Sequence, residues 1–167
     1  AIMGEVPMVI VDVQRMGPAT GGATTVAQGD IQFLRWGTSG GFPVIVLAPT
    51  DVAECYSFTQ RAFDLSERFR VPVFIATDKE TVLSKATVDV LSWEEVPVRE
   101  RSAAPADAPF VPYPKDAPLG VPVMSPVGGA HLVRFTTSSH DEKAYLSKSA
   151  AEVDALNRRL ASKVEDH

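Results

Sequence analysis

Cysteine is almost absent from this chain of 167 residues, since Cys55 is its only one. A lone thiol cannot form an internal disulfide, and by itself it cannot supply the ligands of a zinc or iron–sulfur centre. The sequence therefore favours a reducing, cytoplasmic environment, and any metal cluster would have to be bound by another chain. Cys55 lies on the apolar stripe of a predicted helix, so we interpret it as an inert buried thiol.

Long apolar runs and an excess of positive charge are also missing. No run of about 18 apolar residues occurs, so no membrane span is predicted. The first residues carry no basic region of the kind that opens a signal peptide. The 16 basic and 21 acidic residues give a formal net charge of −5, which disfavours nucleic acid as a partner. Hydrophobic residues make up 45% of the chain, enough for the core of a soluble globular protein.

Three apolar runs predict a parallel sheet. They cover 6–13 (VPMVIVDV), 43–48 (PVIVLA) and 71–77 (VPVFIAT), and such runs are typical of parallel strands covered on both faces. Apolar residues spaced three and four apart predict a helix over 52–69, capped by Thr50. Strand, helix and strand follow one another at the spacing of a right-handed βαβ unit. The predicted fold class is α/β, built of parallel-sheet βαβ layers.

The stretch 14–30, QRMGPATGGATTVAQGD, follows the first strand and is predicted to be a loop. Its four glycines and one proline exclude a continuous helix or a central strand. Open α/β sheets bind their ligands at the carboxyl ends of strands, where this loop begins. Its one cation, Arg15, offers a planar fork for a carboxylate or phosphate, while Gly17, Thr20 and Gly21 add open backbone N–H groups and a hydroxyl. The alternative is a surface turn with a solvated arginine.

Three aspartates lie near this edge of the predicted sheet, and we favour a structural role for each. Asp12 is interpreted as an acceptor for the amides of the loop. Asp30 is interpreted as the N-cap of a short helix over 31–36, which is apolar enough on several sides to be wedged between other elements. Asp78 is interpreted as the cap of the segment after the third strand, with substrate binding as the weaker alternative.

The composition changes after the sheet. Eight of the 13 prolines lie between Trp93 and Pro126, which predicts an extended arm. Apolar residues along the arm indicate that it lies in a groove on its own domain or on a partner. A short strand is predicted over 132–136, and a helix over 149–164 with Arg158, Arg159 and Lys163 on its solvent side. The predicted boundaries are 1–92 for the α/β unit, 93–148 for the Pro-rich arm and 149–167 for the C-terminal helix.

His140 is the best-placed titratable group outside the loop, since Asp141 and Glu142 follow it directly. The alternative is a polar turn with no binding role. A metal site is not favoured, because a predicted strand separates His131 from His140 and no set of several ligands converges.

The loop and the strands around it resemble the alpha subunit of the 2-oxoacid:ferredoxin oxidoreductases of the pyruvate or 2-oxoglutarate type. The resemblance rests on Gln14-Arg15-x-Gly17-Pro18-x-Thr20-Gly21 followed by Thr24-x3-Gln28-x-Asp30. It continues through 45–49, 62–68, 71–73 and 77–78, and returns weakly at His140-Asp141-Glu142. It therefore covers roughly the first 80 residues well and the remainder loosely.

That family uses thiamine diphosphate to decarboxylate a 2-oxoacid oxidatively, forming an acyl-CoA and reducing ferredoxin. The resemblance implies that Arg15 binds the substrate carboxylate and that Thr20 lies beside the 2-oxo group, with Gly17 and Gly21 shaping the same site. It also implies thiamine diphosphate with Mg and a 4Fe-4S cluster as cofactors.

The departures from the family pattern are as informative as the match. The chain opens directly onto the loop-bearing strand, without a Tyr-Pro-Ile-Thr-Pro segment or the acid that activates the cofactor. We therefore expect the C-terminal half of a pyrimidine-type thiamine-diphosphate-binding domain with its following linker, inactive as an isolated chain. An N-terminal half of the alpha subunit and a beta subunit would hold most of the cofactors, and ferredoxin and the 2-oxoacid would be met through the complex. The alternatives are a non-catalytic structural or regulatory module and a stand-alone anion-binding domain.

Overall fold

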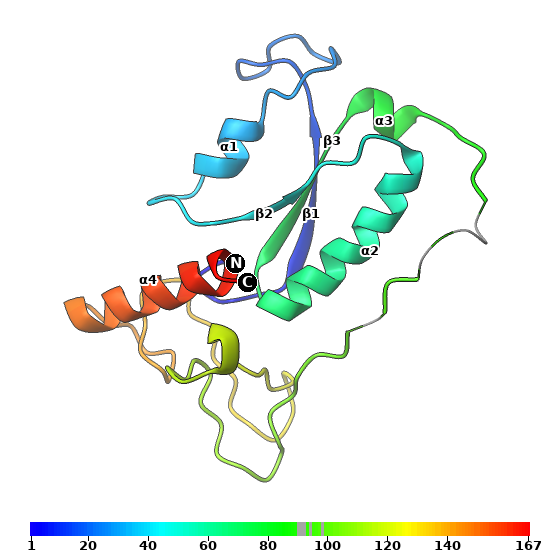
Figure 1. Cartoon of the computed structure of the whole chain (residues 1–167). Coiled ribbons are helices and arrows are strands. Elements are labelled where there is room, and N and C mark those ends of the chain that lie inside the picture. Colours follow the sequence, from blue (N-terminus) through cyan, green and yellow to red (C-terminus); the bar gives the residue numbers. More distant parts are fainter. Residues whose placement is uncertain (90–92, 94, 98) are drawn as a thin grey trace.

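The computed structural model describes residues 1–89, 93, 95–97 and 99–167 of the chain. Figure 1 shows its elements in chain order: β1 Met8–Gln14, α1 Ile31–Trp36, β2 Ile45–Leu47, α2 Val52–Phe69, β3 Pro72–Asp78, α3 Lys79–Leu83, the 3-10 turn η2 Pro118–Gly120 and α4 Ala150–Glu165. The boundary predicted at residue 92 lies outside the described residues.

The three strands form one parallel sheet in the order β1-β3-β2. β3 is central, and it pairs with β1 from Met8↔Pro72 to Gln14↔Asp78. On its other side it pairs with β2 from Ile45↔Val73 to Leu47↔Ile75. The predicted α/β class with a parallel sheet is confirmed. The second strand, Ile45–Leu47, is much shorter than the predicted 43–48, and β1 begins two residues later than predicted.

Helix α2 covers one face of this sheet (Figure 1). Its buried residues Ala62 and Phe69 pack with Val73 and Ile75 of β3 in the hydrophobic core. The helix begins after Asp51, whose Oδ1 accepts a hydrogen bond from the Glu54 amide at 2.8 Å. The prediction that Thr50 is the cap is wrong by one residue, because the Thr50 amide and hydroxyl instead both donate to Glu54 Oε2 at 2.7 Å.

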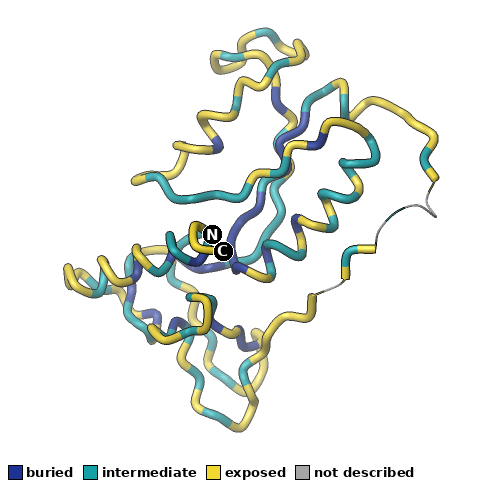
Figure 2. The backbone as a smooth tube through the Cα atoms, in the orientation of Figure 1, coloured by how far each residue is buried: buried dark blue, intermediate teal, exposed yellow. Residues whose placement is uncertain are grey.

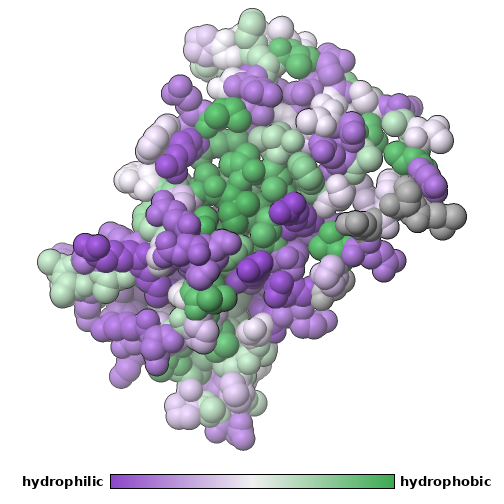
Figure 3. All heavy atoms as spheres, viewed as in Figure 1, coloured by the Kyte–Doolittle hydropathy of each residue, from purple (hydrophilic) through white to green (hydrophobic). Residues whose placement is uncertain are grey.

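Helix α1 lies on the other side of the sheet and covers it incompletely. Leu34 is its buried residue, whereas Phe33 is 70% exposed and Trp36 is 64% exposed. The prediction of a helix over 31–36 is confirmed, but its wedging between other elements is not, since two large aromatic side chains face solvent. Figure 3 shows hydrophobic residues gathered over the sheet between α1 and α2.

The described part of the Pro-rich arm returns to its own chain. Arg101 pairs with Glu67 of α2 at 2.5 Å, and Arg99 pairs with Asp64 at 2.8 Å. Farther along, Met124 is buried and its backbone pairs with residues 102–104. The arm therefore lies against its own domain, which was one of the two predicted placements.

The C-terminal region departs from prediction in two ways. Residues 132–136 form no strand, and Leu132 is 89% exposed. Helix α4 is confirmed, but the prediction that Arg159 and Lys163 face solvent is wrong. Lys163 donates to Glu5 Oε2 at 2.8 Å, and Arg159 donates to both oxygens of the same buried carboxylate. Figure 2 shows buried backbone at this junction, in contrast to the exposed loop after β1.

Candidate functional site

The loop after β1 closes on itself at the carboxyl edge of the sheet. Its backbone forms an antiparallel bridge between Met16 and Gly22, and the Met16 amide donates to Thr25 O at 3.0 Å. The Gly29 amide donates to Arg15 O at 3.2 Å, which holds the far end of the loop against its beginning. The Arg15 backbone is thereby fixed between the end of β1 and the closing hydrogen bonds of the loop.

Gly21 occupies a position that other residues would strain. Its φ is +41°, in the left-handed region that favours glycine. A Cβ atom there would lie 2.2 Å from Met16 O and 2.7 Å from the carbonyl carbon of Gly17. Gly17 and Gly21 are therefore in close backbone contact, and this contact sets the shape of the loop.

Arg15 is exposed and follows the last residue of β1. Within the described residues, its guanidinium forms no hydrogen bond or ion pair. Thr20 is exposed in the same loop. The four residues singled out from the sequence, Arg15, Gly17, Thr20 and Gly21, thus belong to one closed loop whose arginine is available to an anion.

Two buried acceptors lie beneath the loop and were not identified from the sequence as site residues. Asp12 Oδ2 and Gln14 Oε1 are buried and have no hydrogen-bond partner among the described residues. Gln14 is 3% exposed, although it is the residue directly before Arg15. Because buried polar atoms are nearly always paired, these two atoms mark a place where a ligand with N–H or O–H groups would be stabilised.

The surroundings of Asp12 disfavour the charged form of its carboxylate. Burial raises its pKa, and the nearby charge of Asp30 raises it further. The interpretation of Asp12 as an acceptor for loop amides is wrong, because no amide in the described part of the chain donates to it. An acid within an otherwise apolar strand was the sequence signal for this residue.

The other acids behave as caps to different degrees. Asp78 Oδ1 accepts from the Thr81 amide at 2.9 Å, which confirms its predicted capping role. Asp30 occupies the N-cap position of α1, but its side chain makes no capping hydrogen bond. Cys55 is half-buried, and burial raises the pKa of its thiol, consistent with an inert residue.

Neither internal histidine belongs to this edge. His131 is structural, because its Nδ1 pairs with Ser125 Oγ at 2.8 Å and its Nε2 with Ala108 O at 2.9 Å. His140 is buried in a turn next to the arm and α4. Among the residues that the structure describes, no group of three or more His, Cys, Asp or Glu side chains could hold a metal ion.

A parallel α/β sheet with a glycine-rich, arginine-bearing loop at its carboxyl edge is the arrangement in which α/β domains commonly bind ligands. The family model described as "Pyruvate flavodoxin/ferredoxin oxidoreductase, thiamine diP-bdg" matches residues 1–158. The chain belongs to this thiamine diphosphate-binding family, as the loop resemblance predicted.

Named relatives agree with the family. The chain is 37% identical over 164 residues to the 2-oxoglutarate synthase subunit KorA of Methanocaldococcus jannaschii, covering 98% of this chain and 44% of the relative. It is also 37% identical over 170 residues to the same subunit of Methanothermobacter marburgensis, covering 100% of this chain and 44% of that one. The chain thus spans less than half the length of these relatives.

A solved structure shares the fold. It is the 2-oxoglutarate:ferredoxin oxidoreductase from Magnetococcus marinus with 2-oxoglutarate, coenzyme A and succinyl-CoA bound. The TM-score is 0.85 at 25% identity, and the match covers 99% of this chain and 29% of that chain. Separately, no helix within the described residues is long and apolar enough to cross a membrane.

Proposed function

We propose that this chain supplies the substrate-carboxylate loop of a 2-oxoacid:ferredoxin oxidoreductase. The reaction would be the oxidative decarboxylation of a 2-oxoacid, such as 2-oxoglutarate or pyruvate, to an acyl-CoA. The observation that carries the proposal is the unpaired Arg15 guanidinium on a closed loop at the carboxyl edge of the sheet. Family membership and the names of the relatives support the reaction class.

Each loop residue has a distinct task in this proposal. Arg15 takes the substrate carboxylate in two parallel hydrogen bonds, for which its planar fork is suited. The Thr20 hydroxyl donates to the 2-oxo oxygen and orients the carbonyl. Gly17 and Gly21 shape the site, since the absence of a Cβ atom at Gly21 lets the loop close on Met16 and Gly17.

The residues beneath the loop fit the organic part of the cofactor. Thiamine diphosphate supplies the carbanion chemistry of such reactions when it is bound. The unpaired acceptors Asp12 Oδ2 and Gln14 Oε1 would take N–H donors such as the amino group of its aminopyrimidine ring.

The described donor set does not fit the inorganic groups of the proposed enzyme. A Mg²⁺ ion needs several oxygen ligands, and a 4Fe-4S cluster needs thiolates, of which this chain has one, Cys55. We assign both groups mainly to other parts of the enzyme, namely the N-terminal part of an alpha subunit and a beta subunit. Ferredoxin would be the electron acceptor of that complex, and the complex would work in the cytoplasm.

Exposed apolar residues on β1 favour an interface between the sheet and a partner chain. β1 is an edge strand whose Val11 is 59% exposed and whose Val13 is 46% exposed. The unpaired backbone groups of an edge strand and exposed apolar side chains both favour cover by another chain. The unit 1–92 would carry this interface, with the arm 93–148 and the helix 149–167 as separate segments.

Arg15→Lys tests the proposal in the assembled oxidoreductase that contains this chain. A point charge would replace a bidentate fork, so KM for the 2-oxoacid should rise by about tenfold or more. Arg61→Lys is the matched control, because Arg61 is an exposed arginine on α2 far along the chain from the loop. Folding should be unaffected in both, since the Arg15 side chain contacts no described partner. Unchanged KM and kcat in Arg15→Lys would remove this loop from the substrate site and favour a structural role for the chain.

A further inference from the structure

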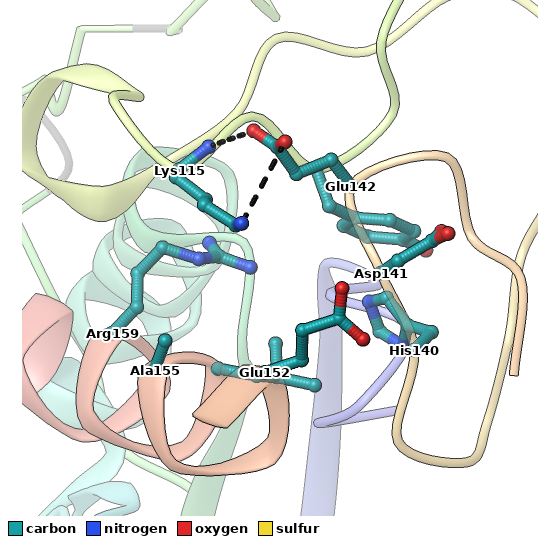
Figure 4. A pocket seen from close by; sticks show the side chains of 9 residues that line it. Lys115, His140, Asp141, Glu142, Glu152, Ala155 and Arg159 are labelled. Carbon is teal, nitrogen blue, oxygen red and sulfur yellow. Dashed lines mark hydrogen bonds and ion pairs between the residues drawn. The ribbon is translucent and has the colours of Figure 1, made fainter. Parts of the chain in front are cut away.

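A cavity lies away from the sheet edge, between the arm, the turn around His140 and helix α4 (Figure 4). Its volume is about 110 Å³. At roughly 30 Å³ per molecule of liquid water, this is space for about four waters or one small organic molecule. The proposed function makes no use of this cavity, so any role for it is independent of the loop after β1.

His140 lines this cavity and carries a buried nitrogen that is unsatisfied within the described chain. The residue is 3% exposed, and its ring packs on Tyr113 at 4.2 Å between centroids. Its Nδ1 lies 2.8 Å from Ser138 O, and since a carbonyl oxygen only accepts, Nδ1 carries the proton. In the tautomer with the proton on Nδ1, Nε2 is an acceptor, and it is buried without a partner among the described residues. A ligand that donates a hydrogen bond would satisfy it.

Glu152 of α4 adds a second acceptor. One of its oxygens, Oε2, accepts from the Ser147 hydroxyl. The other two lining acids are better matched: Glu142 pairs with Lys115, and Asp141 accepts from two backbone amides at 2.9 Å. Within the described part of the chain, Glu152 is therefore the lining carboxylate with neither a cation nor an amide as its partner. Figure 4 shows its carboxylate pointing into the space that the His140 ring also borders.

Two cations, Lys115 and Arg159, line another side of the cavity, next to Glu142. Lys115 Nζ reaches Glu142 only at 3.9 Å, which leaves most of its donor capacity free. Arg159 is held rigidly, because it donates to both oxygens of Glu5 and to Gly120 O at 2.7 Å. Within the described chain, its Nε and one hydrogen of Nη2 donate to no acceptor. Figure 4 shows both side chains directed towards the same space as Glu152.

We propose that this cavity binds a small zwitterion of the amino-acid class, of about the size of glycine or alanine. The ligand ammonium donates to Glu152 and to His140 Nε2, and its carboxylate accepts from Lys115 and Arg159. Ala155 and Leu156 line the cavity and would contact a short aliphatic side chain. Both ends of the ligand are needed, because the acceptors and the donors lie on different sides of the cavity.

Simpler ligands leave part of the cavity unmatched. An inorganic anion would engage Lys115 and Arg159 but bring further negative charge to Glu152 and leave Nε2 of His140 unpaired. A metal ion lacks ligands, because the described His, Cys, Asp and Glu side chains form no group of three around any point. The zwitterion alone gives each unmatched group a partner of the opposite kind.

Calorimetry on the full chain tests the proposal, with side-chain NMR of His140 as a second readout. Glycine or alanine should bind with a Kd on the order of 1 mM, the range for so few ligand atoms. Binding should move the His140 Nε2 nitrogen resonance, because a hydrogen bond forms at that atom. Propionate and ethylamine each carry one half of the zwitterion, and both should bind at least about tenfold more weakly.

Variants locate the site. Glu152→Gln should weaken binding by about tenfold or more, since it removes the charge that faces the ammonium. Asp154→Asn is the matched control on the same helix, because Asp154 pairs with Arg158 in solvent. Ala155→Leu keeps every charge and fills part of the cavity, so it should abolish binding. This variant tests the proposal even if Glu152→Gln fails to fold. Equal binding of propionate or ethylamine, an unmoved His140 resonance, or full affinity in a folded Ala155→Leu variant would overturn the proposal.

Discussion

Lys163 Nζ donates a hydrogen bond to Glu5 Oε2 at 2.8 Å, and neither side chain is exposed to solvent. The residues lie on α4 and just before β1, so this pair joins the two ends of the described chain. Arg159 donates to the same carboxylate, and Arg70 donates to the Glu5 backbone oxygen at 3.0 Å. One buried anion is therefore surrounded by three cations.

Glu5→Gln should destabilise the protein strongly. The substitution leaves Lys163 and Arg159 buried against a neutral amide, and breaking a buried ion pair from one side costs about 3–5 kcal/mol. The measurement is the free energy of unfolding from urea titration. Asp154→Asn breaks the exposed pair with Arg158 and should leave that free energy nearly unchanged. Equal, small effects of both variants would show that the buried cluster adds no stability.

Alkaline pH should stabilise the fold through Lys163. Burial lowers the pKa of its ammonium from 10.5 to about 8, and Glu5 opposes this shift only in part. Between pH 8 and 10.5 the unfolded chain binds the extra proton, so the unfolding free energy should rise with pH across that window. The gain is of the order of 3 kcal/mol. Lys163→Met should remove this slope, and a slope identical in the variant would assign it to other groups.

Acid should destabilise the fold through Glu5 of the same cluster. Burial acts to raise the pKa of Glu5, but the Arg159 hydrogen bond and the Lys163 charge outweigh it and leave that pKa below 4.5. Stability from this carboxylate is complete above pH 4.5 and is lost as the pH falls through the lowered pKa. Glu5→Gln should therefore flatten the acid limb of the stability curve measured by urea unfolding at each pH.

Gly21→Ala should open the loop after β1. The new Cβ would collide with Met16 O and would hold a positive φ, with an expected loss of about 1–3 kcal/mol in unfolding free energy. Amide exchange at Met16 should accelerate, because its bond to Thr25 O depends on the same turn. Gly40→Ala separates the two causes, since Gly40 has a φ of +83° but no atom within 4 Å of its added Cβ. A smaller loss is expected there, and equal losses would exclude the collision.

Asp12→Asn should stabilise the protein and lower the turnover of the assembled oxidoreductase. The carboxylate is partly buried without a partner and its pKa is raised, so removing its charge should increase the unfolding free energy at neutral pH. The gain is no more than about 1 kcal/mol, because solvent screens a partly buried group. If Asp12 faces the cofactor, turnover of the assembled oxidoreductase should fall while stability rises. A variant that loses both would assign Asp12 to the fold.

Local patterns were sufficient to predict the strands of the sheet and the helix that covers it. The spacing of apolar residues gave α2, and the uninterrupted apolar run gave β3, because both signals depend only on near neighbours in the chain. The loop with Arg15 was also predictable, since glycine and proline limit the backbone directly. The prediction of Thr50 as the cap of α2 was wrong by one residue for a local reason, since Thr50 and Asp51 are both good caps.

The features that the sequence did not predict depend on contacts between residues far apart in the chain. Nothing near Lys163 in the sequence reveals that its partner, Glu5, lies 158 positions away. The orphan acceptor of Gln14 became visible only when the strands were in register and the loop was folded above them. The exposure of Phe33 and Trp36 depends on which surfaces lie opposite α1, which periodicity alone does not specify.

The strand order β1-β3-β2 has a consequence for the time course of folding. Met8 pairs with Pro72, so β1 waits for 64 further residues before its hydrogen-bonding partner exists. At ribosomal rates of about 5–20 residues per second, that is a delay of roughly 3–13 seconds. During this delay the unpaired β1 edge is open to chaperones or to wrong strand pairing. The buried ion pairs of Glu5 with Arg159 and Lys163 form only after α4 has been synthesised. The segment that leads into β1 is therefore the last of these parts to be fixed.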